Sequence, residues 1–149
     1  MRYIIAFPLL ALSVAALSHQ SSIPPSELAL GGISIDASEQ QVRTLLGEPI
    51  IITREVDHLN LHLHYAHLTV SFSGEVVGRL RSESNRACTP AGLCPGDPLG
   101  RAVDLYGEPE LVEREDGITY WEYYTEFPCW LQLVPDESRI GSIRAVCQP

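Results

Sequence analysis

The sequence predicts an α+β fold built from two tandem repeats, each a helix followed by an antiparallel meander, with the helices packed on one face of the sheet or sheets. The first supporting observation is a five-residue motif that occurs twice, LLGEP at residues 45–49 and LYGEP at residues 105–109. Each motif ends a run in which apolar residues recur at helical spacing. Each is also followed by segments of alternating apolar and polar residues, which is typical of strands with one buried and one solvated face.

The two repeated motifs contain residues that end a helix. Gly47 and Gly107 can adopt the left-handed backbone conformation just past the last helical residue. Pro49 and Pro109 then prevent each helix from continuing. The residues expected to cap the helix N-termini are Asp36, with Glu39 at the third helical position, and Asp97, directly before Pro98.

The strand segments follow the two helices in the same order. In the first repeat they are residues 50–56, 59–65, 68–72 and 76–80, and in the second repeat they are residues 110–115, 118–125, 129–134 and 140–147. Alternation is strictest over residues 59–65. Three leucines and Tyr65 share one face there, and the opposite face carries His62 and His64. The two copies are expected to pack into one unit, because two repeats are too few for a solenoid.

The N-terminal residues indicate export. Arg2 precedes an apolar stretch over residues 4–17 and a small-residue pattern at residues 16–18, which predicts a signal peptide over residues 1–18. The stretch is short for a permanent membrane span, although an uncleaved anchor is the alternative. The remaining boundaries are a flexible lead-in at 19–32, a first repeat at 33–82, a Cys/Pro/Gly linker at 83–95 and a second repeat at 96–149.

The charge of the chain excludes several partners. There are 19 acidic residues against 10 basic ones, all of them arginine, which gives a formal net charge of −9. Such a chain repels nucleic-acid phosphates and anionic membrane surfaces, so neither nucleic acid nor a stable membrane anchor after signal cleavage is expected. There is no glycine-rich phosphate loop, dinucleotide fingerprint or nucleophile elbow, so neither a cofactor nor an enzymatic activity is predicted.

The order of these elements resembles a known family. A helix, then Leu-x-Gly-x-Pro, then a meander with a glycine turn is similar to the SmpA/OmlA (BamE-like) domains, with Gly47, Pro49, Gly107 and Pro109 as the matching residues. The layout is also similar to the secreted β-lactamase-inhibitory proteins, which are tandem copies of a related unit. The resemblance implies small α/β sandwiches that bind other proteins of the bacterial envelope. This chain lacks the lipidated cysteine of the envelope lipoprotein.

The four cysteines all lie in the second half and predict disulfides in an exported chain. The favoured pairing is Cys88 with Cys94 and Cys129 with Cys147, because Cys129 and Cys147 alternate onto one face of neighbouring strands. A bridge from the Cys94 region to the sheet is the alternative. A zinc site is disfavoured because no pair has the usual two-residue spacing.

Two sets of side chains are candidate binding sites. His62 and His64 project together from a cluster that also contains His58 and His67, and the pair could hold zinc or copper. The alternative is that these histidines are only polar residues on the solvent side of a sheet. The second set is Tyr120, Tyr124 and Trp130, expected on an exposed face marked as wet by Glu122, unless the first repeat or the linker covers it.

These observations favour a periplasmic or secreted, non-catalytic module that binds another envelope or secreted protein. A periplasmic metal-binding protein using the histidine pair is the first alternative. An inhibitor of a secreted enzyme is the second, and it follows from the resemblance alone.

Overall fold

The computed structural model describes residues 22–148. The predicted signal peptide lies outside these residues. A short 3-10 helix, η1 (Pro25–Glu27), opens the described chain. The two α-helices in this range are α1 (Glu39–Leu46) and α2 (Leu99–Tyr106), and the strands are β1 (Ala29–Leu30), β2 (Ile33–Ser34), β3 (Ile51–Arg54), β4 (Leu61–His64), β5 (Thr69–Ser73), β6 (Val76–Ser82), β7 (Glu110–Glu113), β8 (Thr119–Tyr124), β9 (Cys129–Asp136) and β10 (Arg139–Cys147).

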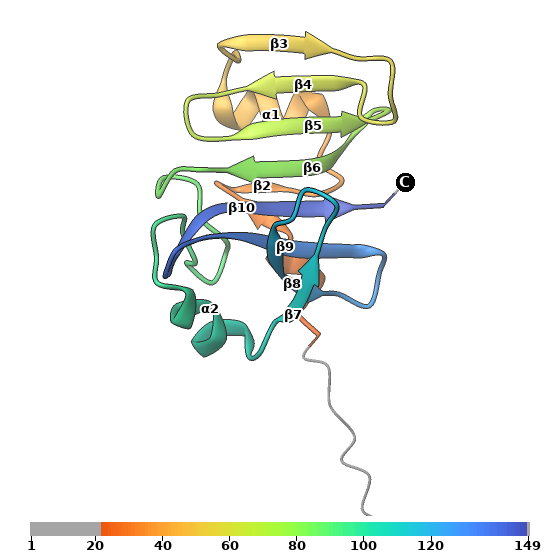
Figure 1. Cartoon of the computed structure of the whole chain (residues 1–149). Helices are drawn as coiled ribbons and strands as arrows, with labels where there is room; N and C mark the ends of the chain where they lie inside the picture. The colour runs from red at the N-terminus through yellow and green to blue at the C-terminus, as the bar shows by residue number, and fades with distance from the viewer. Residues whose placement is uncertain (1–21, 149) are drawn as a thin grey trace, which may run out of the picture.

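The predicted fold class of two helix-plus-meander repeats is wrong, because the protein is mostly β. Eight strands form one antiparallel sheet in the order β3-β4-β5-β6-β10-β9-β8-β7, and β1 and β2 form a small separate sheet. Each α-helix has only eight residues. The strands before and after α2 do not fold as separate units, because β6 and β10 pair along residues 79–82 and 143–146. Figure 1 shows the resulting continuous stack of strands from β3 to β7.

One face of this sheet carries the core. A single row of paired positions crosses six strands and is at most 1% exposed; its members are Leu63, Val70, Leu80, Ala145, Leu131 and Tyr123. Val42 of α1 and Ala102 of α2 belong to the same apolar cluster. Both helices therefore cover this face, and in Figure 1 α1 lies behind β4 and β5.

The segment predicted to be a flexible lead-in is packed into the core where the structure describes it. Ile23, Leu28 and Leu30 are each no more than 4% exposed. The backbone N–H of Ile23 donates to the carbonyl oxygen of Tyr124 at 2.9 Å, which ties the segment to β8. Its apolar residues cover core surface that two short helices leave open, and this explains why it is ordered.

The helix ends differ in part from the prediction. α1 is capped by Ser38 and Gln41 in a reciprocal capping box, because Asp36 takes a positive φ of 69° two residues earlier. No side chain caps α2, and Asp97 instead accepts a hydrogen bond from the backbone N–H of Cys94 at 2.9 Å. Gly47 and Gly107 follow the last helical residues with φ of 77° and 84°.

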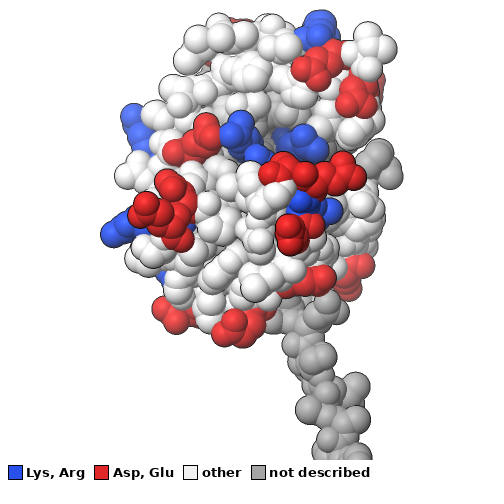
Figure 2. Space-filling model, viewed as in Figure 1, with Lys and Arg blue, Asp and Glu red and all other residues white. Residues whose placement is uncertain are grey.

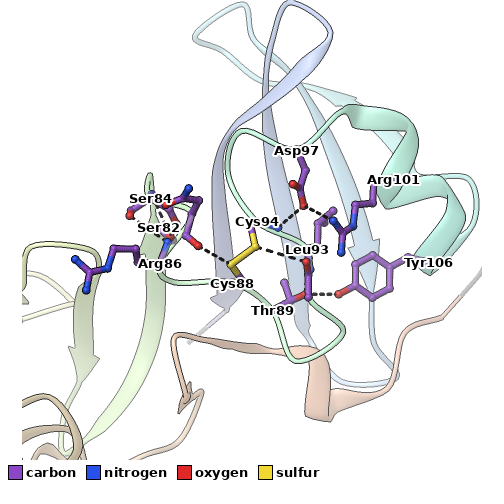
Figure 3. Close-up of a disulfide and its surroundings, with 12 residues drawn as sticks. Ser82, Ser84, Arg86, Cys88, Thr89, Leu93, Cys94, Asp97, Arg101 and Tyr106 are labelled. Carbon is purple, nitrogen blue, oxygen red and sulfur yellow. Dashed lines mark hydrogen bonds and ion pairs between the residues drawn. A yellow bond between two sulfur atoms is a disulfide. The ribbon is translucent and has the colours of Figure 1, made fainter.

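Two disulfides hold the second half together, in the pairing that the sequence favoured. Cys129 bonds to Cys147 across β9 and β10, and Cys88 bonds to Cys94 in the loop before α2. Figure 3 shows the smaller loop, where the hydroxyl groups of Thr89 and Tyr106 are 2.7 Å apart. The Tyr106 hydroxyl also donates to Glu27 at 2.6 Å. The disulfide loop, α2 and the N-terminal segment are therefore joined by one hydrogen-bonded network.

Candidate functional site

The face of the sheet opposite the core, called here the open face, contains every binding residue that the sequence singled out. Paired positions place His62, Ser71, Arg79, Val146, Trp130 and Tyr124 in one row. A neighbouring row contains His64, Thr69, Arg81, Arg144, Gln132 and Glu122. The histidine pair and the aromatic set therefore lie on the same face, on the β4 and β8 sides of it respectively.

Glu122 is the centre of a buried polar network on this face, where the sequence predicted a wet surface. Its side chain is only 1% exposed. One carboxylate oxygen accepts hydrogen bonds from Arg114 at 2.6 Å and from Gln132 at 2.8 Å, and the other accepts from the hydroxyl of Tyr124. Burial, followed by this hydrogen bond, raises the pKa of Tyr124. The charge of Glu122 is tolerated because its lone pairs are satisfied.

The predicted aromatic docking surface is not exposed as expected. Tyr120 is 4% exposed, and its hydroxyl donates to Asp116 at 2.5 Å. Tyr124 and Trp130 are half-buried against each other, with ring centroids 5.9 Å apart. The loop after β7 supplies Asp116, which accepts from Tyr120, and Arg114, which binds the same Glu122 that accepts from Tyr124. The two tyrosine hydroxyls are therefore hydrogen-bonded within the molecule, and the ring of Trp130 packs on Tyr124.

His62 and His64 lie side by side, with ring centroids 6.4 Å apart. Their nitrogens face hydroxyl groups: His62 Nδ1 is 2.8 Å from Ser71 Oγ, and His64 Nε2 is 3.1 Å from Thr53 Oγ1. Glu55 is the nearest carboxylate, 3.6 Å from His62 Nε2. Within residues 22–148 no three His, Cys, Asp or Glu side chains are grouped to hold a metal ion. The metal-binding alternative stays a prediction.

The strand β3 has an unusually apolar exposed surface, although its sequence predicted a half-buried strand. It is an edge strand of the sheet, with only β4 as a neighbour. Ile50, Ile51 and Ile52 are consecutive and are 71%, 59% and 48% exposed. Long apolar edges are uncommon in soluble proteins because their free backbone groups template pairing with another chain. A run of β-branched residues is equally typical of a strand inside a sheet, so no sequence pattern distinguished this edge.

An apolar depression of about 310 Å³ adjoins the start of this edge. Ile50 lines it together with Leu46, Tyr65, Leu68 and Ala87, and the remaining lining residues are Gly31, Ala66, His67 and Arg86. It lies between the end of α1, the turn that joins β4 to β5, and the loop that follows β6. Ile50 belongs to both the exposed isoleucines and this depression, and the two features together are called here the β3 edge.

Comparisons with known proteins support the fold and do not supply a family. No family model and no curated protein matches the chain. An extracellular protein containing a SCP domain from Bacillus anthracis is similar in structure, with a TM-score of 0.57 and 11% identity over 93% of this chain and 50% of that one. A DUF4309 family protein from Bacillus subtilis has a TM-score of 0.56 and 11% identity over 86% of this chain and 88% of that one.

At this identity the likeness concerns the fold alone. The chain spans half the length of the Bacillus anthracis protein. Neither neighbour is described as a SmpA/OmlA domain or as an inhibitor, so that resemblance stays a prediction. The two disulfides and the extracellular neighbour are compatible with an exported protein. Neither helix in the described part of the chain is long and apolar enough to cross a membrane.

Proposed function

We propose that this chain is an exported, non-catalytic protein-binding module that takes an extended apolar segment of another envelope or secreted protein onto the β3 edge. The observation that carries the proposal is a run of three exposed isoleucines, with Ile50 just before β3 and Ile51 and Ile52 within it, on a strand whose outer side has no neighbour in the described sheet. Strand addition uses the free backbone groups of such an edge for affinity, and it uses pockets for alternate side chains for specificity.

The apolar depression beside Ile50 supplies the pocket that this mode of binding needs. A segment that pairs with β3 would run past the depression, where one of its apolar side chains could be buried between Leu46 and Leu68. The exposed faces of Ile51 and Ile52 lie on opposite sides of the strand, so they would contact alternate side chains of the bound segment. We therefore expect a ligand with apolar residues at alternate positions.

The opposite edge of the same sheet is a natural comparison. β7 is also an edge strand of four residues, but it begins and ends with glutamate and its only large exposed apolar side chain is Leu111, at 62%. Acidic residues on an edge disfavour pairing with another strand. This contrast favours the β3 edge over β7 as the binding edge and supplies a matched control.

The proposal is tested by selecting from a displayed library of random nine-residue peptides on the oxidised protein. We expect enrichment of peptides with β-branched or aromatic residues at alternate positions. The variant Ile51→Lys should weaken their binding by about tenfold or more, whereas Leu111→Lys should retain it. Because both positions are exposed, both variants should keep the melting temperature of the parent protein.

Three outcomes would contradict the proposal. The first is a library that yields no enriched peptide, and the second is an equal effect of Ile51→Lys and Leu111→Lys on binding. The third is a dimer of the free protein, detected by light scattering, that Ile51→Lys converts to a monomer, because a second copy would then occupy the edge.

A further inference from the structure

A second depression, of about 220 Å³, lies on the open face away from the β3 edge. Arginines from three segments line it: Arg79 of β6, Arg144 of β10 and Arg114 from the loop after β7. Figure 2 shows arginine side chains gathered over the middle of this face, with carboxylates around them. Such a gathering is unexpected in a chain with a formal net charge of −9.

Two of the three arginines have no carboxylate bound to them in the described chain. Arg114 is neutralised by Glu122 at 2.6 Å. Arg144 contacts the amide oxygen of Gln132, at 3.3 Å, and both the hydroxyl and the ring of Tyr120, whose centroid lies 5.6 Å away. Asp116, which accepts from the same hydroxyl, attracts Arg144 without forming an ion pair with it. Partial burial and then repulsion from Arg144 lower the pKa of Arg79, so these two guanidinium groups lie close enough to repel each other.

Two buried hydrogen-bond donors at the same place are also unsatisfied. The Nε–H of Arg144 and the indole Nε1–H of Trp130 are buried and have no partner in residues 22–148. Both side chains line the depression. Buried donors of folded proteins almost always have an acceptor. A group bound beside these donors would therefore be an acceptor, and the neighbouring guanidinium groups favour one with negative charge.

We propose that this depression binds one carboxylate group on a short carbon chain, with Arg79, Arg144 and Trp130 as its donors. The charge favours a monoanion, because three arginines and the two carboxylates of Asp116 and Glu122 leave one positive charge uncompensated. Asp57 attracts Arg79 only at longer range, and its own oxygen is 2.8 Å from His58 Nδ1.

The apolar walls of the depression explain why we expect the carboxylate of the ligand to be attached to a short carbon chain. Val146 and the ring of Trp130 line it together with Tyr120. A volume of about 220 Å³ is below the range of pockets that hold drug-sized ligands, so the occupant is a small group. A propionate-like acid, the side chain of a glutamate or the C-terminus of a protein each presents this chemistry. The inference does not depend on docking at the β3 edge.

The proposal is tested by recording nitrogen–proton NMR spectra of the oxidised protein during titration with sodium propionate at constant ionic strength. We expect saturable shifts of the Trp130 indole and Arg144 Nε–H signals. Arg144→Gln and Arg79→Gln should each weaken binding by about tenfold or more. Arg81→Gln is the matched control, because Arg81 lies on the same strand but pairs with Glu83 at 2.5 Å outside the depression, and it should retain binding.

Two further arms distinguish the source of the carboxylate. A short peptide with a free C-terminus that binds more tightly than its amidated form identifies a protein terminus, and tighter binding of a glutamate-containing amidated peptide identifies a side chain. Shifts that do not saturate, equal binding by all three arginine variants, or tighter binding of inorganic phosphate than of propionate would overturn the proposal. Ile51→Lys should leave the propionate shifts unchanged, which separates this site from the β3 edge.

Discussion

At the scale of the residue, the polar side chains buried on the open face differ in whether the fold itself satisfies their hydrogen bonds. Glu122 would be exposed if strand alternation alone set its environment, yet three donors from β8, β9 and the loop after β7 surround it. Arg144 lies two strands away in the same row and has one buried donor, its Nε–H, without a partner in the described chain. The first residue stabilises the fold, and the second is the one that we propose binds a carboxylate.

The tyrosines provide a prediction on pH dependence. All five tyrosines in the described chain have raised pKa values: burial is the main cause for Tyr65, Tyr106, Tyr123 and Tyr124, and the hydrogen bond to Asp116 is the main cause for Tyr120. In the unfolded chain tyrosine ionises near pH 10. Because the folded pKa values are higher, stability is complete below about pH 10 and falls as the pH rises further.

The ultraviolet absorbance of the phenolates measures this directly. In the folded protein we expect most of the tyrosine signal to appear well above pH 10 and to coincide with unfolding, whereas in concentrated urea it should appear near pH 10. A folded protein whose tyrosines all ionise near pH 10 without loss of structure would show that these hydroxyls are accessible.

At the scale of the element, the predictable features were those that depend on neighbours in sequence. Alternation placed Leu61 and Leu63 in the core, and the glycines after the helices follow from local backbone preference. The exposure of Ile51 could not be predicted, because a strand shows the same apolar pattern at an edge as in the interior of a sheet. The cap at Ser38 was missed because a positive φ at Asp36 moved the start of α1.

The two disulfides should stabilise the fold unequally. They close loops with sequence separations of 6 for Cys88–Cys94 and 18 for Cys129–Cys147. Loop-closure entropy gives about 2 kcal/mol for the shorter loop and about 3 kcal/mol for the longer one. Urea unfolding of the two paired Cys→Ser variants should therefore show the larger loss for Cys129 and Cys147. A larger loss for Cys88 and Cys94 would mean that the network of Thr89 and Tyr106 depends on that bridge.

At the scale of the whole molecule, the sheet is one unit because β6 and β10 join its two groups of strands. This pairing links residues more than sixty positions apart in sequence, so no local pattern encodes it. For the same reason the sequence suggested two helix-plus-meander repeats, whereas the structure has one sheet and one core. Local patterns therefore located most strands, while the fold class and the sites on the open face depended on long-range register.

A shared core predicts a single unfolding transition. Far-UV circular dichroism reports the whole sheet, and the fluorescence of Trp121 and Trp130 reports β8 and β9. The two signals should change together during urea unfolding, and a chain truncated after Ser82 should fail to fold because β6 then loses its partner. Separate transitions, or a folded fragment, would show that the two strand groups are independent.

The central claim, that the β3 edge binds a segment of another protein, is tested most directly by amide hydrogen exchange. The oxidised protein is compared alone and with a saturating concentration of a selected peptide. We expect rapid exchange of the outward-facing amides of β3 in the free protein, their protection in the complex, and no change in β7. Protection in β7, in the strands around Glu122 or nowhere in the chain would contradict it.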